Sequence, residues 1–275
     1  MTKRNVPIRG QSIYVEIEGE EHLPTVVFLH GFTGSTSTWM DVRRHLAGSY
    51  RTVAVDLTGH GKTSIPDDPE RYGMKEQLTD LNELFNELNM QAFHLVGYSM
   101  GGRIALGYTV EYPEKVNALI LESSSPGLED EADRHTRKAA DRLLAKKIMD
   151  NGLKSFVNSW ENIPLFNSQK ALPTEQREQI RQERLSQTEK GLSNSLLGIG
   201  TGSQPSYWHM LDSIRKPVLL LTGELDEKFV NIAMEMKKRV PSWKHTVVSD
   251  AGHAIHVEKP SLFATMIKDY MNELH

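Results

Sequence analysis

Short apolar segments alternate with segments of helical pattern, and this alternation constrains the fold more than any other feature. The apolar segments are continuous, which is typical of strands covered on both faces of a sheet. Strands that alternate with helices in this way predict an α/β protein with a doubly wound, mostly parallel sheet. The predicted core strands are 25–29, 52–55, 93–96, 118–121 and 218–221.

The alternation stops after residue 125. Residues 126–208 contain no strand-like segment and are helical in composition. We therefore expect 1–125 and 209–275 to form one core, with 126–208 inserted as a helical cap. Ligands of open α/β sheets bind outside the carboxyl ends of the strands, so the cap is expected to cover that edge. Segment 13–17 alternates instead and predicts an antiparallel edge strand.

Composition excludes several function classes. The 275 residues carry a net charge of −4, so no basic excess favours a nucleic-acid partner. The chain has no cysteine, which excludes a disulfide framework, a cysteine nucleophile and cysteine-ligated metal. No apolar run approaches the ~18 residues of a membrane helix, and none follows the basic start of the chain. We expect neither membrane insertion nor a signal peptide, and a cytoplasmic location by default.

The segment GYSMG at 97–101 carries the strongest chemical signal. It follows a strand-like segment and precedes a helical one, the context in which G-x-S-x-G presents a serine nucleophile, here Ser99. The same turn places the N–H of Met100 at a helix start, where negative charge is favoured. A plain Gly/Ser turn has the same pattern, so other segments must decide.

Three further segments supply the partners that such a serine needs. The loop after the first core strand offers the Phe32 N–H as a second oxyanion donor. Asp226 follows the last core strand, and His253 lies in a glycine-containing loop before the final helix. A histidine takes the serine proton at neutral pH, and the acid fixes its tautomer. The chain order Ser99, Asp226, His253 is that of α/β hydrolases.

Other residues compete for these roles. Glu224 lies two positions before Asp226 and is not excluded, although Asp226 lies farther past the strand end. His256 follows His253 by three positions, and a surface or packing role fits it better than catalysis. His30 fits the shaping of the oxyanion loop better than proton transfer.

The whole chain resembles the α/β-hydrolase superfamily and, within it, the 2-succinyl-6-hydroxy-2,4-cyclohexadiene-1-carboxylate synthases of menaquinone biosynthesis. GYSMGGR is shared with many hydrolases, whereas GTGSQPSYW and the lid arginines are more particular. The residues before Pro-Gly in ESSSPGL depart from the pattern of relatives. Besides the lid residues, the matching segments are LHGFTGS (29–35), GYSMGGR (97–103), ESSSPGL (122–128), DRHTR (133–137), GTGSQPSYW (200–208) and GELDEKF (223–229).

The resemblance implies a lyase that needs no metal or organic cofactor. Its reaction is proton abstraction followed by elimination of pyruvate from 2-succinyl-5-enolpyruvyl-6-hydroxy-3-cyclohexene-1-carboxylate. In this scheme Ser99 is the general base, deprotonated through His253 and Asp226, and no acyl-enzyme forms. The Phe32 and Met100 N–H groups hold the developing oxyanion.

The resemblance also implies that arginines bind the three carboxylates of this substrate. Planar, always-charged guanidinium groups suit carboxylates. Arg103, four residues after Ser99, lies one helical turn along the same face, although an ordinary helix arginine paired with an acid is the alternative. Arg137 and Arg184 match carboxylate-binding lid positions. Without the resemblance, sequence does not distinguish them from their basic neighbours Arg134, Arg142, Arg177 and Arg181.

Aromatic residues complete the expected pocket. Tyr98 and Trp160 are its predicted lining residues, and Lys228 is a weaker candidate anion contact. A carboxylesterase or a carbon–carbon bond hydrolase with the same triad is the main alternative function. A binding protein that has lost turnover is a further alternative, against which the intact triad argues. The sequence leaves open the oligomeric state, the lid motion and the pairing of each arginine.

Overall fold

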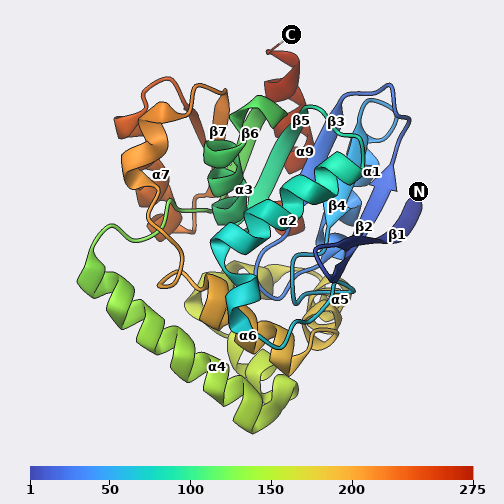
Figure 1. Cartoon of the computed structure of the whole chain (residues 1–275). Helices are drawn as coiled ribbons and strands as arrows, with labels where there is room; N and C mark the ends of the chain where they lie inside the picture. Colours follow the sequence, from blue (N-terminus) through green and yellow to red (C-terminus); the bar gives the residue numbers. More distant parts are fainter. Residues whose placement is uncertain (275) are drawn as a thin grey trace.

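The structure is a computed structural model, and it describes residues 1–274. Eight strands within these residues form one sheet, which is visible at the centre of Figure 1. They are β1 (Thr2–Ile8), β2 (Gln11–Glu18), β3 (Thr25–Leu29), β4 (Arg51–Val55), β5 (Phe93–Tyr98), β6 (Val116–Glu122), β7 (Val218–Gly223) and β8 (Lys244–Val248).

The strand order is β1-β2-β4-β3-β5-β6-β7-β8. β2 is antiparallel to both of its neighbours, whereas the strands from β4 to β8 are parallel to one another. The predicted doubly wound, mostly parallel sheet is therefore confirmed. The expected antiparallel strand is present as β2, but its place at the sheet edge was wrong, because β1 pairs with its outer side.

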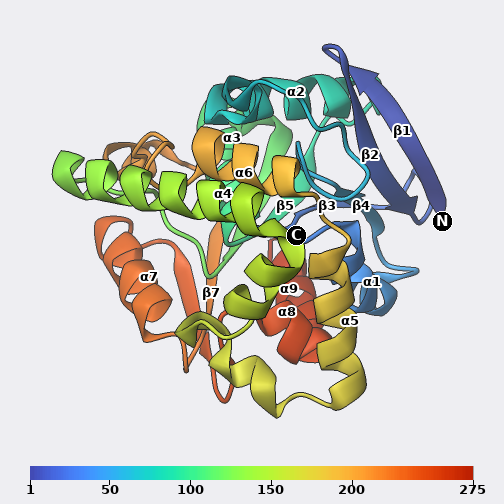
Figure 2. The ribbon, with the colours of Figure 1, turned by 90° about the horizontal axis from the view of Figure 1, so that it is seen from below.

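Successive residues of the central strands point to opposite faces, so each face has its own core. In β3, Val27 and Leu29 join one core cluster, whereas Val26 and Phe28 join the other. Figure 2 shows α2 and α3 on one side of the sheet and α1 and α9 on the other. The core helices are α1 (Met40–Leu46), α2 (Met74–Glu87), α3 (Met100–Glu111), α7 (Glu227–Arg239), α8 (Ile255–Glu258) and α9 (Pro260–Asn272).

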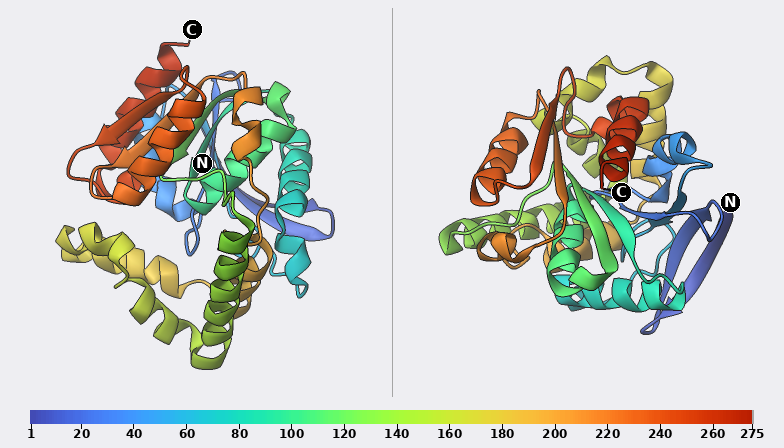
Figure 3. Two further views of the ribbon diagram at one scale, coloured as in Figure 1. Left: turned by 90° about the vertical axis from the view of Figure 1, so that its left-hand side faces the viewer. Right: turned by 90° about the horizontal axis from the view of Figure 1, so that it is seen from above.

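Only helical elements lie between β6 and β7 in the described chain. They gather beyond one end of the strands, as Figures 1 and 3 show, and share a small apolar core of their own. Gly152, at φ 80°, breaks the first and longest of them. These cap elements are α4 (Glu131–Trp160), the 3-10 segment η4 (Pro164–Ala171), α5 (Thr174–Leu185) and α6 (Glu189–Ile199). No helix within residues 1–274 is long and apolar enough to cross a membrane.

Candidate active site

Ser99 occupies a sharp turn between β5 and α3. Its φ of 49° is in the left-handed region, which costs free energy for a residue with a side chain. The turn packs so closely that a Cβ on Gly101 would lie 2.2 Å from the carbonyl oxygen of Leu29. A Cβ on Gly97 would lie 2.5 Å from the carbonyl oxygen of Gly101. Both glycines of the motif are therefore required sterically to hold the serine at the top of the sheet.

The three residues of the predicted triad meet although they come from distant parts of the chain. Nε2 of His253 lies 3.0 Å from Oγ of Ser99, and Nδ1 lies 2.6 Å from Oδ2 of Asp226. A carboxylate only accepts, so Nδ1 donates to Asp226 and Nε2 of the neutral ring accepts from the Ser99 hydroxyl. His253 and Asp226 are buried. This arrangement can move the serine proton onto the imidazole while the acid stabilises the resulting charge.

The competing residues lie elsewhere. Glu224 is exposed and accepts the backbone N–H of Asp250 at 3.1 Å. His30 is fully buried, and burial lowers its pKa to about 3. Its Nε2 accepts the N–H of Leu57 at 3.0 Å while Nδ1 donates to the carbonyl of Gly31 at 2.8 Å. The neutral ring of His30 thus pins the loop that carries Phe32.

The N–H groups of the two predicted oxyanion donors have no hydrogen-bond acceptor within residues 1–274. Within residues 1–274, neither the N–H of Phe32 nor that of Met100 donates to a backbone or side-chain group. Met100 begins α3, so its N–H belongs to the unpaired first turn of a helix. Both residues border the cavity that contains Ser99. The role of these groups as an oxyanion hole stays a prediction, with free donors in its favour.

A cavity of about 460 Å³ lies between the sheet edge and the cap. Ser99 and His253 form part of its wall, and Asp226 lies behind the histidine. The core and the cap both contribute, so neither part of the chain forms the cavity alone. Its other predicted lining residues are Phe32, Tyr98, Met100, Arg103, Arg137, Trp160 and the candidate anion contact Lys228.

Comparisons with known proteins agree with this architecture. The family model described as "alpha/beta hydrolase fold" matches residues 24–260. The chain is 45% identical over 96% of both chains to a Bacillus subtilis protein named "Putative 2-succinyl-6-hydroxy-2,4-cyclohexadiene-1-carboxylate synthase". It is 31% identical, over 90% of this chain and 92% of the other, to the synthase of that name from Enterobacter. The chain belongs to this synthase family, within the α/β hydrolases.

A solved structure of the family has the same fold. The structure titled "Structure of MenH from S. aureus" superposes with a TM-score of 0.90 at 38% identity, covering 94% of this chain and 98% of the other. The expected fold and family are confirmed together. The roles of individual side chains in the present synthase rest on its own geometry.

Arg103 is the buried cation of the synthase cavity. One guanidinium nitrogen donates to the carbonyl of Ile199 at 2.8 Å and also to the side chain of Gln204. Burial lowers the pKa of Arg103 to about 10, so the group stays charged at neutral pH. No carboxylate among residues 1–274 lies within 4.0 Å of it. Arg103 is therefore a buried charge that has no direct ion pair within the described residues, with Asp141 as its more distant electrostatic partner.

Arg137 reaches the same cavity from the cap. It is half-buried on α4, and its Nε donates to Oδ1 of Asp141 at 2.8 Å. Asp141 is itself buried, and its other carboxylate oxygen has no hydrogen-bond partner. This acid partly neutralises the cationic end of the cavity that Arg103 and Arg137 share.

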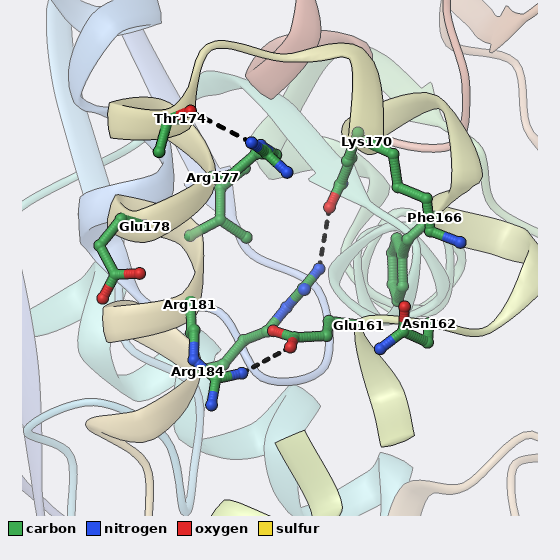
Figure 4. Close-up of a pocket in the computed structure, with 11 residues that line it drawn as sticks. Glu161, Asn162, Phe166, Lys170, Thr174, Arg177, Glu178, Arg181 and Arg184 are labelled. Carbon is green, nitrogen blue, oxygen red and sulfur yellow. Dashed lines mark hydrogen bonds and ion pairs between the residues drawn. The ribbon is translucent and has the colours of Figure 1, made fainter. Parts of the chain in front are cut away.

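Arg184 does not line the Ser99 cavity in this structure. It borders a second cavity of about 280 Å³ between η4 and α5, which Figure 4 shows. Its guanidinium lies over the ring of Phe166 at 4.6 Å and donates to Gln169 at 3.0 Å. Phe166 borders both cavities, so its side chain forms part of the wall between them. The Phe166 ring therefore lies between the Arg184 guanidinium and the Ser99 cavity.

The basic neighbours of Arg184 are distinguished by their partners. Arg181 forms an ion pair with Glu161 at 2.5 Å, and Arg177 donates to Thr174 at 3.1 Å. Both border the second cavity (Figure 4). Arg184 is the buried one of the three, and no carboxylate in the described chain lies within 4.0 Å of it.

Sequence reasoning missed several residues of the site. Phe166 and Phe229 pack their rings against His253, at centroid distances of 6.2 and 4.7 Å. Nothing in the pattern around Phe166 marked it. Gln204, which holds Arg103, lies within GTGSQPSYW, so its place in a particular motif was the signal that could have found it.

Proposed function

We propose that this protein eliminates pyruvate from 2-succinyl-5-enolpyruvyl-6-hydroxy-3-cyclohexene-1-carboxylate to give 2-succinyl-6-hydroxy-2,4-cyclohexadiene-1-carboxylate, a carbon–oxygen lyase step of menaquinone biosynthesis. Family membership supports this assignment. We also propose that it acts in the cytoplasm on this small tricarboxylate, without a nucleic-acid or membrane partner.

One observation carries the choice of an anionic substrate: Arg103 is buried in the wall of the Ser99 cavity, and no carboxylate among residues 1–274 forms an ion pair with it. Burying an unpaired charge is costly, so a ligand carboxylate that pairs with it recovers free energy on binding. An apolar ester has no group for this position. Arg137, and Arg184 if the Phe166 ring moves, supply further guanidinium groups for the remaining carboxylates.

In the proposed mechanism Ser99 is a base and not an acylating nucleophile. Its oxygen removes the proton next to the succinyl ketone while its own proton passes to Nε2 of His253, and Asp226 stabilises the imidazolium. The electron pair of the broken C–H bond forms the C2=C3 double bond, the ring pair at C3=C4 shifts to C4=C5, and the C5–O bond to the enolpyruvyl group breaks. The leaving enolpyruvate takes up the proton held by His253 and becomes pyruvate.

The transient negative charge on the ketone oxygen needs donors. The N–H groups of Phe32 and Met100 are unpaired within residues 1–274 and border the cavity, so they are the donors we assign to it. The arginines orient the substrate so that the C–H bond faces Ser99, and the cap excludes water.

A coupled assay tests this function. Pyruvate release from the enolpyruvyl precursor is followed through NADH consumption by lactate dehydrogenase, with the spontaneous rate subtracted. We expect release by the wild type, none above background by Ser99→Ala, and wild-type release by the matched control Ser213→Ala, an exposed serine. Wild-type protein that releases no pyruvate but rapidly hydrolyses p-nitrophenyl esters would replace the lyase assignment with an esterase.

A further inference from the structure

A second buried acid–histidine pair lies beside the catalytic triad. Glu122 ends β6, and His256 lies in α8, three residues after His253. Oε2 of Glu122 is 2.8 Å from Nδ1 of His256, and Nε2 of that ring is 2.9 Å from the hydroxyl of Thr38. Both Glu122 and His256 are almost completely inaccessible to solvent. The acid–histidine–hydroxyl connection of the triad is thus repeated with different residues.

This second array has no room for a substrate. The indole of Trp39 stacks on the His256 ring with a centroid distance of 4.3 Å. Thr38 borders a cavity of only about 50 Å³. This space holds a few water molecules and no acyl group. The array therefore acts on its surroundings and not on a ligand.

Glu122 contacts both segments that carry the reacting groups. Its carbonyl oxygen accepts the backbone N–H of Ser99 at 2.9 Å. Its carboxylate accepts the backbone N–H of His256 at 3.0 Å, which fixes the loop that begins at His253. The Tyr98 ring fills the space between, with centroid distances of 4.6 Å to the His256 ring and 5.3 Å to the His253 ring.

The backbone around Glu122 is strained on both sides of this contact. Ser99 has a φ of 49°, and Ser123, directly after Glu122, has a φ of 44°. Residues with side chains keep such angles only where their surroundings impose them. Two backbone hydrogen bonds supply this constraint. The Ser99 N–H donates to the Glu122 carbonyl, and the Ser123 N–H donates to the Leu221 carbonyl at 2.9 Å.

We infer that Glu122 and His256 are positioning residues that keep Nε2 of His253 within hydrogen-bond distance of Ser99. Bonds to an ionised carboxylate are stronger than neutral ones, and in a buried site no water replaces them. Loss of the carboxylate frees the loop that carries His253, while the chemistry of the triad residues themselves is unchanged. The inference concerns the Ser99–His253 pair and does not depend on the substrate.

The test is the rate at which Ser99 reacts with a small fluorophosphonate. The serine oxygen forms a bond to phosphorus, the P–F bond breaks, fluoride leaves, and His253 takes the proton. Glu122→Ala is compared with the matched control Asp80→Asn. Asp80 is a buried acid on α2 that accepts hydrogen bonds from Arg9 at 2.9 Å and from Gln11 at 2.7 Å. Both variants are measured well below their melting temperatures.

We expect Glu122→Ala to label about 10- to 100-fold more slowly than the wild type, because a 1 Å displacement of a reacting group costs rates of this order. Asp80→Asn is expected to lose comparable thermal stability but to label at close to the wild-type rate. Glu122→Gln is expected to lie between, since its amide oxygen still accepts the His256 N–H.

A purely structural role predicts a different result. Glu122→Ala that folds and labels Ser99 at the wild-type rate would overturn the inference, as would an equal loss in Asp80→Asn. If Glu122→Ala does not fold, Glu122→Gln decides in the same way. In the pyruvate assay, the slower variants should lose kcat with little change in KM. Should no pyruvate form at all, the labelling rates still decide the question.

Discussion

Arg103 donates a hydrogen bond of 2.8 Å to the carbonyl oxygen of Ile199, which joins α3, the helix after Ser99, to α6 of the cap. The same guanidinium is buried without a carboxylate partner in the described chain. The Arg103 side chain thus links the core to the cap and also places a positive charge in the wall of the cavity between them.

Replacing Arg103 should damage turnover far more than folding. In the proposed binding mode, Arg103→Ala loses a charge-assisted hydrogen bond to a substrate carboxylate worth about 2–4 kcal/mol, so we expect kcat/KM to fall by roughly 30- to 1000-fold. Stability should fall by a smaller amount, because the carbonyl of Ile199 and the side chain of Gln204 lose a donor while a buried unpaired charge is removed. Steady-state pyruvate release and thermal melting measure the two effects. An unaltered kcat/KM would remove Arg103 from the site.

Arg184 and Arg181 provide a matched comparison within one helix. Arg181 already pairs with Glu161, whereas the buried Arg184 forms no ion pair within residues 1–274, so we expect a ligand carboxylate to gain more from Arg184. Arg184→Ala should raise KM about tenfold or more, and Arg181→Ala should change it less than about threefold. Initial-rate curves for both variants check this order, and equal effects would contradict it.

The choice between the two acids after β7 has a direct test. Asp226→Asn cannot accept from Nδ1 of His253 as a carboxylate does, so the ring loses its productive tautomer. We expect kcat to fall by about 10³- to 10⁴-fold. Glu224→Gln, whose side chain accepts a backbone N–H at the surface, should stay within about twofold of the wild type. Reversed effects in the pyruvate assay would assign the acid to Glu224.

Acid stability should depend on two buried histidines. Burial lowers the pKa of His60 to about 4 and that of His30 to about 3, whereas an unfolded histidine titrates near ~6.5. Between these values the unfolded chain binds more protons than the folded one, so stability is full above pH ~6.5 and is lost as the pH falls. Urea unfolding from pH 4.5 to 7.5 measures this slope.

His60→Leu should reduce that slope by about one proton, because the variant has one fewer group that titrates only after unfolding. His22→Gln is the matched control, since His22 is exposed and its replacement should leave the slope unchanged. The His60 ring packs against Phe32, so the absolute stability of His60→Leu can differ while the slope remains diagnostic. Equal slopes in wild type and His60→Leu would disprove this account.

The sequence predicted the central strands because continuous apolar runs are a local signal. It predicted the grouping of Ser99, Asp226 and His253 from one local motif and from the order of the three residues along the chain. Ser99 lies in a motif with steric requirements, and Asp226 and His253 follow in an order with one common geometry. Strands β1 and β8 were missed for a physical reason: they lie at the two edges of the sheet and are largely exposed, so they carry no continuous apolar run.

The positions of residues that depend on tertiary packing could not be predicted from the sequence. His256 was expected to have a surface or packing role, and it is buried against Trp39. Its pairing with Glu122, far away in the chain, left no pattern. The position of Arg184 likewise depends on how α5 packs against Phe166 of η4, which no spacing along the helix specifies.

The cap leaves the sheet from β6 and returns to it at β7, and these two strands are hydrogen-bonded neighbours. Evolution can therefore lengthen, shorten or exchange the whole insertion while every strand pairing and the contacts of His253 with Ser99 and Asp226 remain in place. A gene encoding this scaffold can acquire a new ligand preference through one contiguous stretch of coding sequence, and a protein engineer can graft a different insertion at the same two junctions.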